Sequence, residues 1–502
     1  MSMRALYTAS TSRIPCGHTT RCIGTTLSFA IAYLLLNPSL HARAPLRDDP
    51  AAEIDALFKE YDNQNSPGAA IVVVRDGNVI FKNAYGSADL EHGFPITSGT
   101  VFHVGSVSKQ FTAFSVLLLE QQGKLSLDDD VREYLPEVPD FGKVITLRHL
   151  LHHQSGLREQ ETLFQMSGIS TADVVETAHI LKLVGRQREL DFDPGENISY
   201  SNTGYVLLAQ VVEKVTGVSF RKWTQEDLFA RLSMKDSQFN DNAARVVRNR
   251  ACPYYIDDGG DIQKGILSYF FVGSTGLQTT ADDMAKWLSN SARPKVGNQT
   301  ITQKMLFESG RLKSGEDPGY GYGMGVLRYR GLRVAWHSGH DAGYRALTAY
   351  VPDEKFGVAV LSNFYSIDPS SLGKKIVSIY LSDSLSPEPL KPSTPEAAEH
   401  SAEPEKPFAV DQKMLVECAG DYISEELDTT YHLLVVDGAL VIRHWRNEDV
   451  RLRPKGPDLF AGDREWAETV RFLRDAQYGI TGFRLTAGRV RSILFKRLAQ
   501  HR

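Results

Sequence analysis

The stretch 104-VGSVSKQFTA-113 resembles the start of a helix, but it carries a lysine where a helix start disfavours one. Ser106 is a residue type that caps helices, and Lys109 occupies the position where a capping box would have Glu or Gln. A cation in the first turn opposes the helix dipole and costs roughly a few tenths of a kcal/mol. Residues three apart lie one turn apart on the same helix face, so the side chains of Ser106 and Lys109 can meet. Such a contact would give this lysine a functional role.

A serine and a lysine placed in this way form a candidate nucleophile and base. The helix dipole and burial both disfavour the charged amine, so the pKa of Lys109 is expected to fall. A neutral amine can take the proton of a hydroxyl, and helix N-terminal amides can stabilise an oxyanion. Ser-x-x-Lys alone is a weak signal, because common residues recur at this spacing by chance. A capped helix with a solvated lysine is the alternative.

Two further short motifs lie downstream at expected element boundaries. Tyr200-x-Asn202, in 193-DPGENISYSNTGY-205, comes just before a helical pattern. His337-x-Gly339, in 336-WHSGHDAGY-344, comes at the end of a strand pattern. The glycines beside His337 allow a substrate backbone to come close. Three motifs in this order indicate one site that is assembled from distant parts of the chain.

Strand patterns lie at both ends of residues 45–383, and helical patterns lie between them. Neighbouring strands at each end favour an antiparallel sheet that closes by bringing the two ends together, which predicts an α+β domain. The expected strands are a hairpin over 68–86 around Asp76-Gly77 and the runs 332–339, 345–351 and 357–363; the expected helices cover 109–126 and 203–217, with another starting at Thr146.

A composition change marks a second domain. Residues 384–407 hold six prolines and five glutamates without apolar periodicity, which is typical of an extended linker. Residues 408–502 carry short strand patterns around Asp437-Gly438 and Ala487-Gly488. This pattern predicts a small all-β domain, either a barrel or a sandwich.

The N-terminus has the layout of a secretory signal. Arg4, Arg13 and Arg21 precede an apolar run over 23–36, and Ala42-x-Ala44 offers a cleavage site. We therefore expect residues 1–44 to be a signal peptide and the protein to be periplasmic or secreted. An uncleaved N-terminal anchor is the alternative, although the run is shorter than the roughly 20 residues that span a bilayer comfortably.

The composition of the chain limits the classes of partner that it is expected to bind. An apolar content of 42% and a charged content of 23% are ordinary for a soluble globular protein. Removing residues 1–44, which hold four basic side chains and no acidic ones, changes the formal charge from −5 to −9. This charge and the lack of a basic stripe argue against nucleic acid as a partner. No membrane span is expected after the signal, and the oligomeric state is left open.

No metal or organic cofactor is expected. The sequence has no CxxC pair, no HExxH and no other dense ligand spacing. His149 and His153 stand four residues apart and could bind a metal, but we favour a structural role for them. The two cysteines beyond the signal, Cys252 and Cys418, are far apart in the sequence, so the fold is not expected to depend on a disulfide.

With these three motifs the chain resembles the penicillin-recognising serine hydrolases, the family of class C β-lactamases, D,D-peptidases, D-aminopeptidases and related esterases. The segments 150-LLHHQSGL-157, 273-GSTGLQTTADDMAKW-287 and 320-YGYGMGV-326 match the family as well. The resemblance covers about residues 50–383 and implies a β-lactamase/transpeptidase-like fold: an antiparallel sheet flanked by helices, with a helical subdomain. The C-terminal domain resembles the small β-barrels appended to several of these enzymes.

The resemblance also implies roles for individual residues. Ser106 is the nucleophile that becomes acylated, Lys109 is its base, and Tyr200 shuttles the proton. Tyr200 is expected to need a depressed pKa, which a neighbouring charged lysine can provide. Asn202 would hold a substrate amide, and the oxyanion would be bound by the backbone N–H groups of Ser106 and His340.

The third motif departs from the β-lactamase pattern. His337 stands where these enzymes usually have a lysine that binds the substrate carboxylate, and a histidine is mostly neutral at pH 7. Arg345, six residues after Gly339, could replace that charge, although a solvated arginine at a strand end is the other reading. The pocket walls are expected from segments 158–190 and 240–270, whose sequences indicate no particular substrate.

We therefore expect an exported serine hydrolase that works through an acyl-enzyme on a small ester or amide substrate. A peptide that begins or ends with a D-residue is one option. The alternatives are a β-lactamase of low efficiency and a penicillin-binding sensor or scaffold that is acylated once and does not turn over.

Overall fold

A computed structural model describes residues 49–170, 172–387, 408 and 411–499. The predicted signal segment and nearly all of the predicted linker lie outside the described residues. The described residues belong to one compact unit. Within the described ranges, no helix has both the length and the apolar character needed to cross a bilayer.

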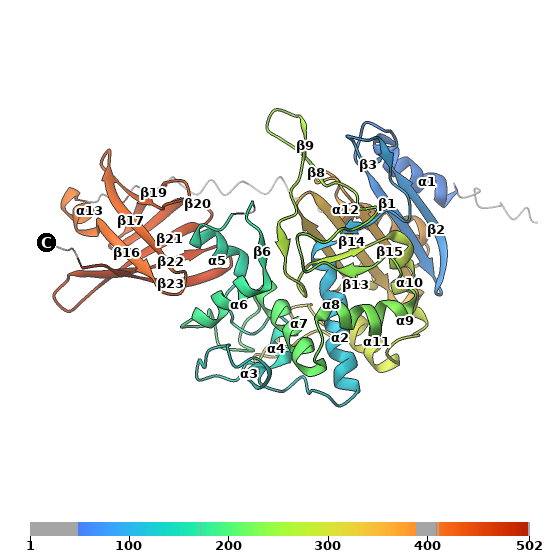
Figure 1. Ribbon diagram of the computed structural model, residues 1–502, viewed down its shortest axis with the longest axis horizontal. Helices are drawn as coiled ribbons and strands as arrows, with labels where there is room; N and C mark the ends of the chain where they lie inside the picture. The colour runs from blue at the N-terminus through green and yellow to red at the C-terminus, as the bar shows by residue number, and fades with distance from the viewer. Residues whose placement is uncertain (1–48, 171, 388–407, 409–410, 500–502) are drawn as a thin grey trace, which may run out of the picture. The chain divides into compact units, whose positions relative to one another are not determined.

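A six-stranded antiparallel sheet forms the centre of the first domain, in the order β12-β13-β14-β15-β1-β2 (Figure 1). Strand β1 pairs with β15, with Ala69 opposite Ser362, so the two ends of the domain close the sheet as predicted. The predicted Asp76-Gly77 turn joins β1 to β2, and both of its residues have positive φ, 51° and 75°. The strands are β1 (Ala69–Arg75), β2 (Asn78–Tyr85), β12 (Gly325–Tyr329), β13 (Leu332–Asp341), β14 (Tyr344–Val351) and β15 (Phe356–Ser362).

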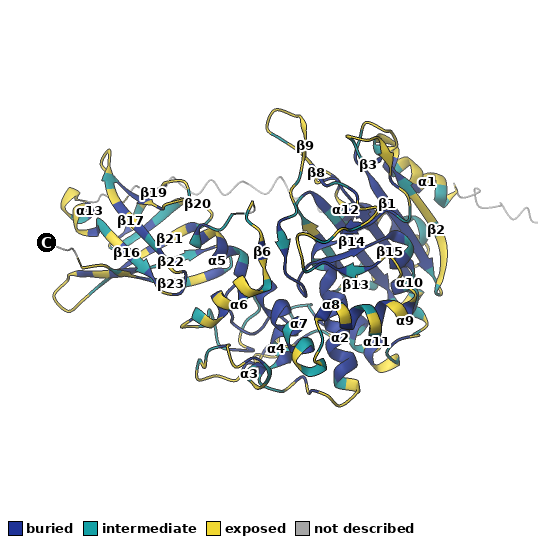
Figure 2. Cartoon of the chain, viewed as in Figure 1, coloured by how far each residue is buried: buried dark blue, intermediate teal, exposed yellow. Residues whose placement is uncertain are grey.

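Both faces of this sheet are covered, which explains why β1 is apolar throughout. Its residues alternate between two cores, with Ala70, Val72 and Val74 in one and Ala69, Ile71 and Val73 in the other. Helices α1 (Pro50–Phe58) and α12 (Pro369–Tyr380) share the second core. Helices α2 (Ser108–Gln121), α10 (Ala281–Ala292) and α11 (Gln299–Phe307) share the first. Figure 2 shows the central strands almost entirely buried.

The middle of the chain is mainly helical. Thr146 caps a helix as predicted, because its Oγ1 accepts from His149 N at 3.1 Å. The further helices are α3 (Val131–Tyr134), α4 (Leu147–Leu151), α5 (Gln160–Ser167), α6 (Thr177–Arg186), α7 (Asn202–Thr216), α8 (Phe220–Trp223) and α9 (Ala230–Leu232). Short strands accompany them: β3 (Ser87–Asp89), β4 (Phe94–Pro95), β5 (Phe102–His103), β6 (Val175–Glu176), β7 (Gln238–Phe239), β8 (Tyr254–Ile256), β9 (Ile262–Lys264), β10 (Tyr269–Phe270) and β11 (Leu277–Thr279).

The start of helix α2 differs from the expectation. A 3₁₀ turn, η2 (Gly105–Val107), precedes it, and the side chain of Ser106 does not cap the helix. Ser108 instead donates its hydroxyl to Gly105 O at 2.6 Å and accepts from Leu277 N at 3.1 Å. The hydroxyl of Ser106 is therefore free of the local role that the sequence suggested for it.

The C-terminal domain is a closed barrel of eight strands, which decides between the two predicted architectures. A short helix, α13 (Gln412–Cys418), precedes it. The strands are β16 (Gly420–Ser424), β17 (Thr429–Val436), β18 (Ala439–Arg443), β19 (Val450–Gly456), β20 (Leu459–Arg464), β21 (Ala467–Arg474), β22 (Ile480–Ala487) and β23 (Val490–Arg497). Cys418 at the end of α13 is buried and Cys252 is partly buried, and both are free thiols.

Candidate active site

Ser106 and Lys109 meet as their spacing predicts. The Nζ of Lys109 donates to Ser106 Oγ at 3.0 Å, to Asn202 Oδ1 at 2.7 Å and to the carbonyl oxygen of Ser274 at 2.9 Å. Lys109 is fully buried. Its amine is thus held by acceptors from three other segments and directed at the hydroxyl of Ser106.

Burial changes the ionisation of this amine. It lowers the pKa of Lys109 to about 7, and the charge of Arg489 acts in the same direction. The carboxylates of Glu161 and Glu159 oppose this shift. The expected fall of the Lys109 pKa is confirmed, and much of the amine is neutral near neutral pH.

Tyr200 lies just before α7 and faces the same pair. Its ring centroid is 4.8 Å from Lys109 Nζ and 4.3 Å from the ring of His153. Burial raises the pKa of Tyr200, and Glu161 adds to this shift, while a hydrogen bond with Ser106 opposes it. The expected depression of the Tyr200 pKa is therefore wrong. Tyr200 is a neutral phenol that can accept and pass on a proton but is not a standing base.

The backbones of η2 and β13 approach each other very closely. A Cβ on Gly339 would lie 2.0 Å from Val104 O and 3.0 Å from Ser106 N, and a Cβ on Gly105 would lie 2.7 Å from His340 N. Gly105 also has a φ of +52°, so this turn requires glycine. The close approach brings the backbones of Ser106 and His340 together, and both residues line the cavity, where an oxyanion hole would require their N–H groups.

His337 is a neutral residue in this structure. Its Nδ1–H donates to the carbonyl oxygen of Ser338 at 2.5 Å, so its Nε2 accepts from the hydroxyl of Tyr320 at 3.1 Å. Burial lowers the pKa of His337 to about 3, and Lys109 contributes to the shift. The expectation that the third motif carries no charge at pH 7 is confirmed.

An open cavity of about 570 Å³ lies over Ser106. Glu161 and Gln165 come from α5 and Tyr269 from β10, so the two segments expected to form the walls do so. The other lining residues are Tyr200, Asn202, Thr275, Tyr320, Gly325, Trp336, His337, Ser338, His340, Asp341, Ala342 and Arg489.

Arg345 does not line this cavity. Its guanidinium lies 3.8 Å from the ring centroid of Tyr365, and its Nε donates to the carbonyl oxygen of Tyr365 at 3.1 Å. The guanidinium of Arg345 is therefore held on Tyr365 outside the cavity lining, which leaves the proposed carboxylate clamp without structural support.

His153 has the structural role that was favoured for it. Its ring packs 4.4 Å from that of Tyr320, and its Nδ1 accepts from Ser201 N at 3.1 Å. Burial lowers the pKa of His153 well below its usual value, so it too is neutral.

The sequence analysis did not identify three residues of the site, Arg489, Glu159 and Glu161. Arg489, in the turn between β22 and β23, donates from Nη1 to the carbonyl oxygen of Tyr200 at 2.8 Å. Its Nη2 lies 3.5 Å from Glu159 Oε2 and 3.6 Å from Glu161 Oε2. Arg489 is 289 residues from Tyr200 in the sequence, and only the packing of the barrel brings them together.

Comparison with known proteins gives one family for the first domain. The family model described as Beta-lactamase matches residues 54–372. A D-aminopeptidase of Gluconobacter oxydans is 27% identical over 60% of this chain and 56% of its own length. A D-aminopeptidase of Brucella anthropi is 29% identical over 64% and 61%. Penicillin-binding protein 4* of Bacillus subtilis is 27% identical over 63% and 73%. The chain thus spans less than two thirds of the length of these D-aminopeptidases.

Solved structures share the architecture. The octameric penicillin-binding protein homologue from Pyrococcus abyssi superposes with a TM-score of 0.57 at 25% identity, over 89% of this chain and 98% of its own. A D-amino acid amidase from Ochrobactrum anthropi superposes with a TM-score of 0.56 at 20% identity, over 67% of this chain and 100% of its own. At that lower identity the second likeness concerns the fold alone.

Proposed function

We propose that this chain, which belongs to the beta-lactamase family, is a serine hydrolase that works through an acyl-enzyme on Ser106. The observation that carries the proposal is the contact of 3.0 Å between the buried amine of Lys109 and Ser106 Oγ. Because the pKa of Lys109 is lowered to about 7, the amine can accept the hydroxyl proton near neutral pH.

The geometry supports a complete acyl transfer. As Ser106 Oγ attacks the substrate carbonyl carbon, Lys109 takes the hydroxyl proton, and the N–H groups of Ser106 and His340 stabilise the oxyanion. Tyr200, hydrogen-bonded to Ser106, passes its proton to the leaving group and takes up the proton that Lys109 removed, so both residues end the step in their starting state. Water then attacks the ester of Ser106 with the same groups in reverse order, which releases the acid and restores the hydroxyl.

We further propose amides or peptides with an N-terminal D-residue as substrates. The name shared by several relatives, D-aminopeptidase, supports this choice. Two carboxyl side chains, Glu161 and Asp341, line the cavity. Asp341 suits the ammonium group of such a substrate, whereas burial and Glu159 raise the pKa of Glu161 to about 8. The neutral His337 lacks the permanent charge that would bind the carboxylate of a β-lactam, which disfavours a dedicated β-lactamase.

A substrate panel tests the proposal. Purified protein is assayed with D- and L-alanine p-nitroanilide, p-nitrophenyl acetate and nitrocefin, beside Ser106→Ala, Lys109→Met and the control Lys124→Met, whose side chain is exposed. We expect repeated turnover of the D-anilide by wild type and Lys124→Met only. Turnover by Ser106→Ala would refute the acyl-enzyme. A stoichiometric burst without turnover would identify a sensor, and efficient nitrocefin turnover a β-lactamase.

We also propose that the protein is exported, on the strength of the basic and apolar segments within residues 1–44. Cell fractionation followed by N-terminal sequencing tests this. When the full-length chain is expressed, we expect a protein outside the cytoplasm that begins shortly after Ala44. Recovery from the cytoplasm with residues 1–44 intact would contradict the proposal.

A further inference from the structure

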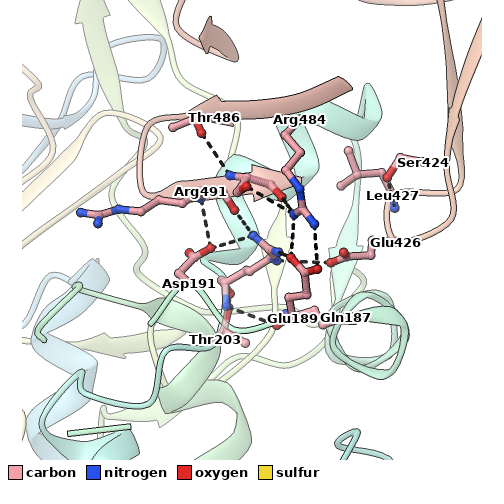
Figure 3. Close-up of polar contacts among 12 residues, drawn as sticks. Gln187, Glu189, Asp191, Thr203, Ser424, Glu426, Leu427, Arg484, Thr486 and Arg491 are labelled. Atoms are coloured by element: carbon pink, nitrogen blue, oxygen red, sulfur yellow. Dashed lines mark hydrogen bonds and ion pairs between the residues drawn. The ribbon is translucent and has the colours of Figure 1, made fainter. Parts of the chain in front are cut away.

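The turn between barrel strands β22 and β23 reaches the catalytic domain. Gly488 in this turn has a φ of +50°, and a Cβ there would lie 3.2 Å from Thr162 Oγ1 in α5. Two residues beyond Arg489, the backbone N–H of Arg491 donates to Asp191 Oδ1 at 3.1 Å (Figure 3). The turn therefore packs closely against the catalytic domain on one side of Arg489 and is hydrogen-bonded to it on the other.

Two glutamates connect Arg489 to the candidate catalytic residues. Glu159 is 1% exposed, and its Oε1 accepts from Asn202 Nδ2 at 3.0 Å. Glu161 Oε1 accepts from the same nitrogen at 2.8 Å. The other amide atom, Asn202 Oδ1, accepts from Lys109 Nζ at 2.7 Å. A short series of contacts thus runs from the barrel arginine through both glutamates and Asn202 to Lys109.

Glu159 also fixes the start of α5. Its Oε2 accepts from the backbone N–H groups of Glu161 and Thr162, at 2.8 and 3.1 Å. This is the same oxygen that faces Arg489, at 3.5 Å. The carboxylates of Glu159 and Glu161 both lie beside Arg489, and two neighbouring carboxylates repel each other. The positive charge of the guanidinium offsets this repulsion.

We propose that Arg489 is a positioning residue of the active site, supplied by the barrel, which holds Glu159, Glu161 and the backbone of Tyr200 around Lys109. The inference rests on the proposed function, in which Lys109 activates Ser106. It makes the C-terminal barrel part of the catalytic unit, because a turn on its surface completes the environment of the base.

The charged and titratable groups around Lys109 come from several elements. They are Glu159 and Glu161 at α5, Tyr200 and Tyr205 at α7, His153 after α4, His337 and His340 on β13 and Arg489 on the barrel. Burial keeps the histidines and tyrosines neutral, since it lowers the pKa of the three histidines and raises that of both tyrosines. The groups whose charge acts on Lys109 are therefore the two glutamates and Arg489, and burial raises the pKa of Glu161 to about 8.

The direction of the effect follows from these charges. Arg489 lowers the pKa of Lys109, and it also lowers the pKa of Glu161, which burial and Glu159 raise. Loss of the guanidinium charge makes the cluster bind protons more tightly, whichever site holds them. The acid limb of catalysis, which reports the protonation of this coupled cluster, should then move to higher pH.

The experiment follows acylation of Ser106 by p-nitrophenyl acetate from pH 5 to pH 9, as kcat/KM and as adduct mass. The variants are Arg489→Gln, Arg489→Lys and the control Arg491→Gln, in the same hairpin, whose exposed side chain points away from the contacts in Figure 3. We expect the acid limb of Arg489→Gln to move to higher pH. A rise of about one pH unit gives roughly a tenfold loss of rate at pH 6. Arg489→Lys should keep the acid limb near wild type, and Arg491→Gln should match wild type throughout.

The outcomes separate the two proposals. If Ser106 of the wild type is not acylated, the proposed function fails. If Ser106 is acylated and Arg489→Gln keeps the wild-type acid limb, the positioning role is overturned. A uniform loss at every pH, without a moved limb, would also overturn it, because that result describes a merely structural residue. If Arg489→Gln fails to fold in a thermal melt, Arg489→Met takes its place under the same criteria: a moved acid limb supports the role, and a wild-type limb overturns it, with or without a uniform loss of rate.

Discussion

Among the ion pairs that join the barrel to the catalytic domain, two clusters differ mainly in burial. The buried cluster is built on Arg158, 1% exposed, with Asp191, 4%, and Glu426, 7%. The pocket cluster is built on Arg489, 37% exposed, with Glu161, 40%, and the buried Glu159. The same chemistry therefore occurs once in a dry interior and once at the edge of an open cavity.

The contacts in the buried cluster are short and come from both domains. Arg158 Nη1 lies 2.7 Å from Asp191 Oδ1, and its Nε lies 3.2 Å from Glu426 Oε2. Arg158 also donates to the carbonyl oxygen of Arg491 in the barrel. Around it, Arg484 of the barrel holds Glu189 (Figure 3). Loss of one partner here leaves a charge that water does not reach, whereas solvent can compensate for a loss in the pocket.

The largest effect on stability is expected from Arg158→Met. The change leaves Asp191 and Glu426 buried without their cation, so the free energy of unfolding should fall by about 3–5 kcal/mol. Urea unfolding measures it, with Arg148→Met as the control, since the ion pair of Arg148 with Asp128 is exposed. A loss below about 1 kcal/mol for Arg158→Met would remove the distinction between the clusters.

A smaller effect is expected from Asp191→Asn, and it depends on pH. Burial raises the pKa of Asp191 to about 6, above its usual value, so the folded state binds this proton more tightly. The stabilisation is complete below about pH 4 and is lost as the pH rises through about 6. Between pH 5 and pH 7, wild type should therefore lose about 1 kcal/mol of unfolding free energy relative to Asp191→Asn.

Urea unfolding at the two pH values measures this difference. Glu189→Gln is the control, because Glu189 is 47% exposed and its pKa is lowered by Arg484. The unfolding free energy of wild type should fall from pH 5 to pH 7 relative to that of Asp191→Asn. No such fall is expected relative to Glu189→Gln. If the difference is constant from pH 5 to pH 7, Asp191 is ionised throughout, and the buried cluster is an ordinary ion pair.

The smallest effect on stability is expected from Arg489→Gln. The side chain of Arg489 is 37% exposed, so water screens the loss of its charge. The free energy of unfolding should therefore fall by less than about 1 kcal/mol, although the pH profile of catalysis moves. Arg484→Gln, in a similarly exposed pair, should give a similar loss without moving the profile. A loss for Arg489→Gln as large as for Arg158→Met would show that both clusters serve stability alone.

Local spacing predicted the parts of the site that depend on one element. Ser106 and Lys109 meet because residues three apart face the same way in a helix start. The sheet followed from strand patterns at both ends of the domain, and β1 does pair with β15. The neutral state of His337 follows from the residue type, and burial strengthens it.

Tertiary packing decided what the sequence could not show. The cap expected of Ser106 is absent because the chain forms a 3₁₀ turn at Gly105, where it packs closely against β13. This strand lies more than 200 residues away in the sequence. The pKa of Tyr200 rises because rings from distant segments bury it, His153 and Tyr320 among them. Arg489 reaches Tyr200 only because the barrel packs on α5, and no short motif marks such a residue.

The acyl-enzyme on Ser106 is the central claim, and mass spectrometry of a quenched reaction tests it most directly. The protein is mixed with D-alanine p-nitrophenyl ester, quenched in acid at successive times and digested. We predict one alanyl group on the peptide that contains Ser106, which appears before steady state, decays as substrate is exhausted, and is absent from Ser106→Ala. Steady turnover with no adduct on that peptide, and with Ser106→Ala still active, would contradict the account.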